Sequence, residues 1–97
     1  MGLQKAVASS EAVVVNPTHI ACALAHDPET GGIIMVASGT DEAASEIRGY
    51  ARRSRVPLFH DRRMARQLLS VPPGGTILHN LAASLEVVLL SLKRYGG

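Results

Sequence analysis

The stretch Val13-Val14-Val15-Asn16-Pro17-Thr18-His19 determines how the rest of this 97-residue chain is arranged. Three consecutive valines predict a strand buried on both faces, because a strand with one exposed face alternates apolar and polar residues. The Asn-Pro pair predicts a turn, since Pro presets its own φ and pushes the preceding residue out of the helical region. The first strand is therefore expected over residues 11–16, with a turn at Asn16-Pro17.

The residues after this turn predict two further strands. Residues 20–25 carry Ile, Cys and Leu on one face and alanines on the other. A strand that is apolar on both faces lies in the centre of a sheet, with helices on each side. The composition of residues 26–32 indicates a loop. Residues 33–37 predict a third buried strand, which is expected to end at Ser38-Gly39.

A helix and a fourth strand are predicted over residues 40–59. Thr40 or Asp41 can cap the helix, whose carboxylates lie at the N-terminal end and whose arginines lie at the C-terminal end. Its apolar stripe consists of Ala43, Ala44, Ile47, Tyr50 and Ala51. Residues 56–59 predict a short strand at a sheet edge or at a strand start, because Pro57 has no N–H for a central ladder. The strand-helix-strand order predicts that the third and fourth strands are parallel and joined by a right-handed crossover.

Two more helices complete the prediction. Asp61 is expected to cap a short helix that carries Met64, Ala65, Leu68 and Leu69 and is broken by residues 71–75. A leucine-rich stripe with helical spacing predicts a final helix buried against the sheet. The stripe consists of Leu78, Leu81, Ala82, Leu85, Val88, Leu89 and Leu92. Residues 3–10 fit either the end of a helix or a flexible lead-in. The predicted fold class is α/β, a small four-stranded mixed β-sheet with helices on both faces.

The composition fits one folded domain with an aliphatic core. Apolar residues make up 46% of the chain and charged residues 19%, with one Phe and no Trp. The formal net charge of +2 is too small to predict nucleic-acid binding. A single cysteine, Cys22, excludes an intrachain disulfide and suits a reducing compartment. The longest apolar run, residues 81–92, contains Glu86 and is shorter than the roughly 20 residues of a membrane span.

Seven arginines gather in the middle of the sequence. They are Arg48, Arg52, Arg53, Arg55, Arg62, Arg63 and Arg66. Such a patch can face an acidic partner or anionic lipid, or can be the solvated face of helices. The sequence favours the solvated face and leaves the other two open.

The Asn16-Pro17 bond has an unusual chemical property. Asn usually deamidates when the following backbone nitrogen attacks its side chain, but Pro17 has no N–H to supply that nucleophile. The remaining route is attack by the Asn16 side-chain nitrogen on its own main-chain carbonyl, which closes a succinimide and releases Pro17 as a new amino terminus. Cleavage within minutes to hours requires a barrier of about 21–24 kcal/mol. A turn pinned between two buried strands can supply roughly 7–11 kcal/mol of this through near-attack geometry.

Two side chains near the bond in sequence can assist the reaction. His19 is expected to act as proton acceptor or shuttle, and Thr18 to hold the turn through its hydroxyl. Most Asn-Pro turns never cleave, so the dipeptide by itself does not predict a function.

Other kinds of site are less well supported. The candidate metal ligands are scattered without the paired spacing of a zinc site: His19, Cys22, His26, Asp27, His60, Asp61 and His79. Cys22 lies in an apolar strand and is expected to be a core residue rather than the nucleophile of a hydrolase. Gly31-Gly32 and Gly74-Gly75 lack the flanking pattern of a phosphate-binding loop. No metal or cofactor is therefore expected.

The segment Asn16-Pro17-Thr18-His19, between a Val-rich and an Ile-Ala-rich strand, resembles the signature of the type III secretion export-apparatus switch proteins. This family comprises the flagellar and injectisome substrate-specificity switches. Residues 39–44 (Gly-Thr-Asp-Glu-Ala-Ala) are similar to the family's Gly-x-Asp-Glu helix start. Residues 56–58 and 64–69 are similar to its Pro-containing strand and its Leu-Ala-Arg-x-Leu helix. The resemblance runs in register from about residue 12 to residue 92.

This resemblance implies a domain that cleaves itself once between Asn16 and Pro17, with no turnover of external substrates, and whose two pieces stay together. Residues 1–10 would be a lead-in from an absent membrane region, and residues 11–97 a single cytoplasmic domain at the bacterial inner membrane. The implied partners are the export apparatus, its secreted substrates or switch regulators, and the transmembrane region itself. The alternative is a docking module of the same fold that binds export substrates without cleaving.

Two positions depart from the pattern of the family. Several members carry Lys in the second strand and before the helix-opening Gly, where this chain has Ala25 and Ser38. A basic docking surface at those places is therefore not expected here. Ile20, directly after the motif, leans towards the injectisome branch over the flagellar branch.

Overall fold

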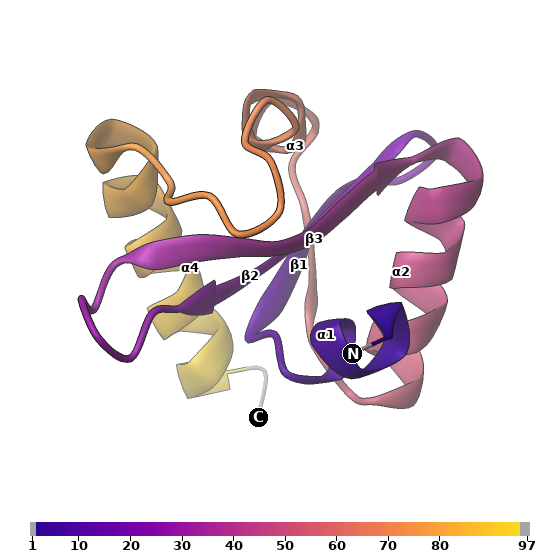
Figure 1. The fold of residues 1–97 in the computed structure, drawn as a ribbon, viewed down its shortest axis with the longest axis horizontal. Coiled ribbons are helices and arrows are strands. Elements are labelled where there is room, and N and C mark those ends of the chain that lie inside the picture. Colours follow the sequence, from indigo (N-terminus) through magenta and orange to yellow (C-terminus); the bar gives the residue numbers. More distant parts are fainter. Residues whose placement is uncertain (1, 96–97) are drawn as a thin grey trace.

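In a computed structural model that describes residues 2–95, a four-stranded sheet lies between two layers of helices (Figure 1). In chain order the elements are α1 (Leu3–Ala8), β1 (Ala12–Asn16), β2 (Ile20–His26), β3 (Ile33–Thr40), α2 (Asp41–Arg53), β4 (Leu58–His60), α3 (Arg62–Leu68) and α4 (His79–Tyr95). This architecture confirms the predicted fold class.

The strand order β3-β2-β1-β4 makes β1 an interior strand. β1 pairs with β2 in antiparallel register, with Val14 opposite Cys22, and with β4 in parallel register, with Val14 opposite Phe59. β2 pairs antiparallel with β3, so β3 and β4 run in the same direction, as predicted, with β2 and β1 between them. β4 is an edge strand that begins directly after Pro57, which agrees with the positions allowed for proline.

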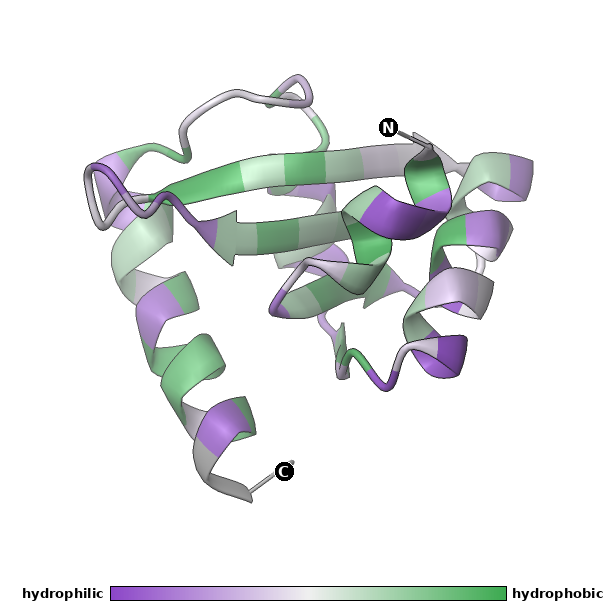
Figure 2. Cartoon of the chain, turned by 60° about the horizontal axis from the view of Figure 1, so that its bottom comes forward, coloured by the Kyte–Doolittle hydropathy of each residue, from purple (hydrophilic) through white to green (hydrophobic). Residues whose placement is uncertain are grey.

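The sheet separates two apolar cores. Val13 and Val15 face α1 and α2, whereas Val14 faces α3 and α4. All three valines are completely buried, which confirms a strand covered on both faces. Each buried valine side chain contributes about 1.5–3 kcal/mol of transfer free energy. In Figure 2 the strands are mainly hydrophobic, and the helices mix hydrophobic with hydrophilic residues.

Several predicted boundaries are wrong, for reasons that lie in tertiary contacts. β3 does not end at Ser38-Gly39 but continues to Thr40, because Gly39 pairs with Ala21 of β2. His26, predicted as part of a loop, is the last residue of β2. Leu78, predicted in the buried stripe of the last helix, precedes α4 and is 78% exposed. Of the two alternatives for residues 3–10, the structure shows a helix, and Val7 is buried against α2.

Gly39 sets the distance between β3 and α2. A Cβ at this position would lie 2.5 Å from the Cβ of Ala43, which is too close for any side chain. The missing side chain lets the end of β3 turn directly into α2 beside the β1–β2 turn, where Asp41 begins the helix.

Candidate functional site at the turn between β1 and β2

The Asn16-Pro17 bond crosses the boundary between the buried sheet and the solvent. Asn16 is the last residue of β1 and is 6% exposed, whereas Pro17, Thr18 and His19 are exposed. The backbone N–H of His19 donates a hydrogen bond to the carbonyl oxygen of Asn16 at 3.0 Å, which closes a four-residue turn. Pro17 occupies the second position of this turn, where its fixed φ is favourable.

The end of β1 is held from both sides. Asn16 pairs with Ile20 of β2 in the antiparallel ladder. On the other side, the backbone N–H of Asp61, between β4 and α3, donates a hydrogen bond to the carbonyl of Val15 at 3.0 Å. The side chain of Asp61 accepts the N–H of Met64 at 2.9 Å and caps α3, as predicted. The residue before the bond is therefore fixed, while the residue after it lies in the turn.

The turn hydrogen bond has a chemical consequence. The Asn16 carbonyl that accepts the His19 N–H is the one a cyclising Asn16 side chain would attack. A donor on this oxygen polarises the carbonyl and stabilises the negative charge that develops there. Removing one donor of this kind in an enzyme raises the barrier by about 2.7–4 kcal/mol.

The ring of His19 faces a residue that the sequence reasoning did not assign to the site. Its Nδ1 lies 3.4 Å from Oδ1 of Asp41, and the backbone N–H of Asp41 donates to the carbonyl of His19 at 3.0 Å. Asp41 has a φ of +51°, in the left-handed region, at the first residue of α2. An Nδ1–H directed at this carboxylate leaves Nε2 of the neutral ring as an acceptor.

The predicted site residues are brought together only in part. Among the hydrogen bonds of residues 2–93, none joins the His19 ring or the Thr18 hydroxyl to the carboxamide of Asn16. The His19–Asp41 pair is also largely exposed, with 67% and 76% of the side-chain surfaces open to solvent. The roles of the His19 ring and of Thr18 remain predictions, whereas the backbone of His19 contacts the Asn16 carbonyl directly.

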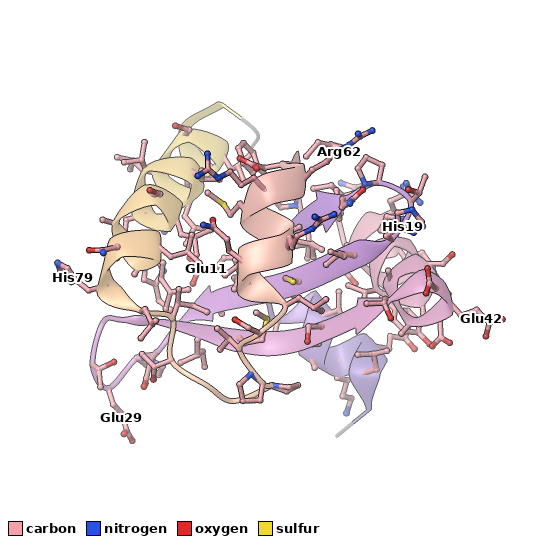
Figure 3. All side chains as sticks on the ribbon, turned by 90° about the horizontal axis from the view of Figure 1, so that it is seen from above. Glu11, His19, Glu29, Glu42, Arg62 and His79 are labelled. Carbon is pink, nitrogen blue, oxygen red and sulfur yellow. The ribbon has the colours of Figure 1, made fainter. Side chains whose placement is uncertain are left out.

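Six of the seven arginines belong to helices on opposite faces of the sheet, and Arg55 lies in the turn after α2. Arg48, Arg52 and Arg53 belong to α2, whereas Arg62, Arg63 and Arg66 belong to α3. Figure 3 shows Arg62 at the same end of the molecule as His19. The three arginines of α3 line a surface hollow of about 400 Å³ together with Gln67. The arginines therefore form no single patch.

The alternative sites of the sequence analysis gain no support. Burial raises the pKa of the Cys22 thiol to about 12, which keeps the thiol protonated, and its Sγ lies 3.8 Å from the carbonyl of Ala65. A protonated, buried thiol is not a nucleophile. Within the part of the chain that the structure describes, no three His, Cys, Asp or Glu residues converge on a possible metal position.

The sequence of this chain is similar to those of secretion and flagellar proteins. The model of the FlhB HrpN YscU SpaS family matches residues 2–90. The hypersensitivity response secretion protein HrcU of Ralstonia nicotianae is 34% identical over 87 residues, which cover 89% of this chain and 24% of HrcU. The flagellar biosynthetic protein FlhB of Helicobacter pylori is 36% identical over 66 residues, which cover 68% of this chain and 18% of FlhB.

Solved structures share the fold. An asparagine-to-alanine variant of the EscU C-terminal domain superposes with a TM-score of 0.88 and 25% identity, covering 93% of this chain and 92% of that chain. The cytoplasmic domain of FlhB from Shewanella putrefaciens superposes with a TM-score of 0.85 and 24% identity, covering 96% and 75%. The sheet and its helices thus define a domain with the fold of the EscU C-terminal domain. The chain belongs to the FlhB HrpN YscU SpaS family.

The chain spans about a quarter of the length of its relative HrcU. None of the helices described here has both the length and the apolar character needed to cross a bilayer.

Proposed function

We propose that this chain is the cytoplasmic domain of a type III export-gate protein, that it cleaves itself between Asn16 and Pro17, and that this cleavage controls the switch in export substrate specificity. One observation carries the proposal. The carbonyl of Asn16, held at the buried end of an interior strand, accepts the His19 N–H in a turn whose next residue is proline.

The reaction is an intramolecular transfer that needs no water. Nδ2 of Asn16 loses a proton and forms a bond to the carbonyl carbon of the same residue. The bond from this carbon to the nitrogen of Pro17 breaks, and the proline nitrogen takes up a proton as a secondary amine. The products are a peptide ending in a succinimide at Asn16 and a peptide beginning at Pro17. Water later opens the succinimide.

The surrounding residues have distinct roles in this step. The backbone N–H of His19 stabilises the oxyanion on the Asn16 carbonyl. Nε2 of His19, left free when Nδ1 faces Asp41, accepts the proton from Nδ2 directly or through a water molecule. Thr18 holds the turn. Holding the Asn16 side-chain nitrogen and the carbonyl of the same residue in near-attack geometry would supply roughly 7–11 kcal/mol.

The fold explains how the cut changes a surface without dismantling the domain. Residues 1–16 would stay bound through β1, which pairs with a strand on each side and buries its valines in both cores. The freed ends would lie at the exposed turn beside His19 and Asp41. Cleavage would then alter the local backbone and charge while leaving the cores intact.

Membership of the family supports the cellular role. The names of the relatives refer to secretion and to flagellar biosynthesis, and solved EscU domains include variants of an asparagine and of the proline next to it. We therefore place the domain at the cytoplasmic face of the bacterial inner membrane, after a transmembrane region. Its partners are components of the export apparatus, secreted substrates and switch regulators. Ile20 favours the injectisome branch.

The competing function is a docking module of the same fold that binds export substrates without cleaving. The arginine-lined hollow on α3 favours this alternative, because three arginines on one helix suit an acidic segment. The two functions differ in whether the Asn16-Pro17 bond survives purification.

The mass of the freshly purified protein under denaturing conditions tests the proposal. We expect two fragments, produced by a break between Asn16 and Pro17. As long as the succinimide has not opened, their masses should add up to the mass of the intact chain. The Asn16→Ala variant should stay whole, whereas Asn80→Ala, at an exposed asparagine of α4, should cleave like the wild type. A wild-type chain that stays intact for days at neutral pH would rule out cleavage. Fragmentation of Asn16→Ala at the same bond would rule out cyclisation.

A further inference from the structure

A second cluster of titratable side chains lies at the opposite end of β1 from the turn. Nδ1 of His26, at the end of β2, lies 2.9 Å from Oε1 of Glu11, and its Nε2 lies 2.5 Å from Oε1 of Glu86 in α4. Glu11 also accepts the backbone N–H of His26 at 2.6 Å. Figure 3 shows Glu11 beside α4 and well away from His19. One imidazole therefore bridges two carboxylates from distant parts of the chain.

The bridge requires a particular protonation state. A neutral imidazole has one N–H and can donate to one carboxylate, whereas the protonated ring donates to both. The hydrogen bond to Glu86 and then the one to Glu11 raise the pKa of His26. Burial alone would raise the pKa of Glu11, but the backbone N–H and the ring of His26 outweigh it, so the pKa of Glu11 is lowered.

Among the side chains that the structure describes, few other charges face this cluster. Lys93 of α4 lies in the same hollow of about 120 Å³, with Leu89 and Leu90, and its charge also lowers the pKa of Glu11. The residue opposite His26 on β3 is the apolar Ile33. The carboxylate of Asp27, next in the chain, accepts the N–H of Glu29 within the loop. Protonation of His26 is therefore governed mainly by the two glutamates.

The cluster adds a polar contact to the apolar face of α4, whose residues Leu81, Ala82, Val88 and Leu92 also pack, partly buried, against the core. Of the described side chains of α4, Leu85 and Leu89 are the two that are buried. Glu86, between them in sequence, connects the helix to His26 and through it to Glu11. Glu11 lies on the N-terminal side of the Asn16-Pro17 bond, and His26 and Glu86 lie on the C-terminal side.

We propose that Glu11, His26 and Glu86 form a proton-operated latch that fastens α4 to the start of β1 and, in the cleaved protein, helps to hold residues 1–16 to the remainder. The second part rests on the proposed function, since the latch joins two chains only after the cut. The first part holds for the intact chain as well.

The direction of the pH effect follows from linkage. A histidine with a raised folded-state pKa stabilises the fold fully below its ordinary value of 6.5, and this stabilisation is lost as the pH rises through the folded-state pKa. Glu11 has a lowered pKa and therefore stabilises the fold fully at pH values above its ordinary pKa of 4.5. This stabilisation is lost as the pH falls through the folded-state pKa of Glu11. The latch is therefore closed at mildly acidic pH and opens towards alkaline pH.

The uncut chain tests the latch independently of cleavage. In an Asn16→Ala background, His26→Gln should lower the melting temperature at about pH 6 by several degrees and by little at about pH 8.5. His79→Gln, at an exposed histidine, is the matched control and should have no effect at either pH. An NMR titration should place the pKa of His26 above 6.5. A pH-independent effect of His26→Gln, or a pKa of His26 at or below this value, would overturn the latch.

The cleaved protein tests the second part. Release of residues 1–16 after dilution, followed by mass spectrometry, should be about tenfold faster at pH 8.5 than at pH 6. His26→Gln should release quickly at both pH values, and His79→Gln should follow the wild type. Equal release from wild type and His26→Gln at pH 6 would refute the role in retention. A wild-type chain that does not split would refute the proposed function instead, and the uncut chain would still decide whether the latch exists.

Discussion

At the scale of single residues, two neighbours with opposite environments meet at one peptide bond. Asn16 is fixed by ladder pairing and burial, whereas Pro17 lies exposed in the turn. The sequence alone shows that Pro17 has no N–H, and it also predicts the local turn. The contact of His19 with Asp41 joins residues 22 positions apart, and local patterns carry no signal for it.

Replacing Pro17 with alanine tests how much the proline contributes. Pro17→Ala restores a backbone N–H, relaxes φ at the second turn position and removes the ring from the leaving amine. Cleavage should slow by about tenfold or more, and deamidation of Asn16 should become detectable as a conversion of Asn to Asp. Peptide mass mapping over several days measures both. Cleavage at the wild-type rate without deamidation would show that the proline is incidental.

Replacing the His19 ring separates it from the backbone N–H. His19→Ala keeps the donor to the Asn16 carbonyl and removes the proposed base, so cleavage should slow by about 10²-fold, the lower end for general base catalysis. Asp41→Asn, which keeps a hydrogen-bonding side chain beside Nδ1, should slow it less. Denaturing gels sampled from the moment of lysis give the rates. If His19→Ala matches the wild type, the ring has no part in proton transfer.

At the scale of elements, local patterns predicted each strand and the three longer helices but missed what depends on contacts across the fold. The valine run predicted that β1 is buried on both faces, and Asp61 predicted the start of α3, because burial on two faces and capping both leave local signals. The predicted end of β3 was wrong because Gly39 does not end the strand. Its missing side chain instead allows a close approach to Ala43. The partners of His26 were missed because Glu86 lies 60 residues away.

The cap of α3 gives a test at this scale. Asp61→Ala removes the acceptor for the Met64 N–H and should lower the free energy of unfolding by about 1 kcal/mol, within a range of 0.5–2 kcal/mol. Asp61→Ser retains an oxygen acceptor and should recover most of the loss. Urea denaturation of both variants in the uncut Asn16→Ala background measures the difference. Equal stability of the alanine and serine variants would contradict a capping role.

At the scale of the whole molecule, cleavage would convert one chain into a complex of two. Residues 1–16 contribute α1 and an interior strand, so the remaining chain depends on them for both cores. Stability then follows mass action, because a two-chain native state dissociates on unfolding.

The melting temperature of the cleaved protein should therefore rise with protein concentration, whereas that of uncut Asn16→Ala should not.

Val14→Ala should weaken retention of residues 1–16 by about tenfold to a hundredfold, from the loss of roughly 1.5–3 kcal/mol of burial. Val87→Ala, at a position of α4 that is 66% exposed, is the matched control. Calorimetry over a wide concentration range measures the first effect, and dilution followed by size exclusion the second. A concentration-independent melting point of the cleaved protein would contradict a two-chain native state.

The interior position of β1 has one more consequence. A strand taken from the rim of a sheet leaves one open edge, but a strand taken from the middle leaves two facing each other, here on β2 and β4. The slot between them would be lined with unpaired backbone groups and apolar walls. It would accept any extended segment of alternating or wholly apolar character in place of the lost one. If residues 1–16 were cut off and lost, the rest of the domain would therefore become a receptor for a foreign strand, and retention of the severed piece would protect it from aggregation.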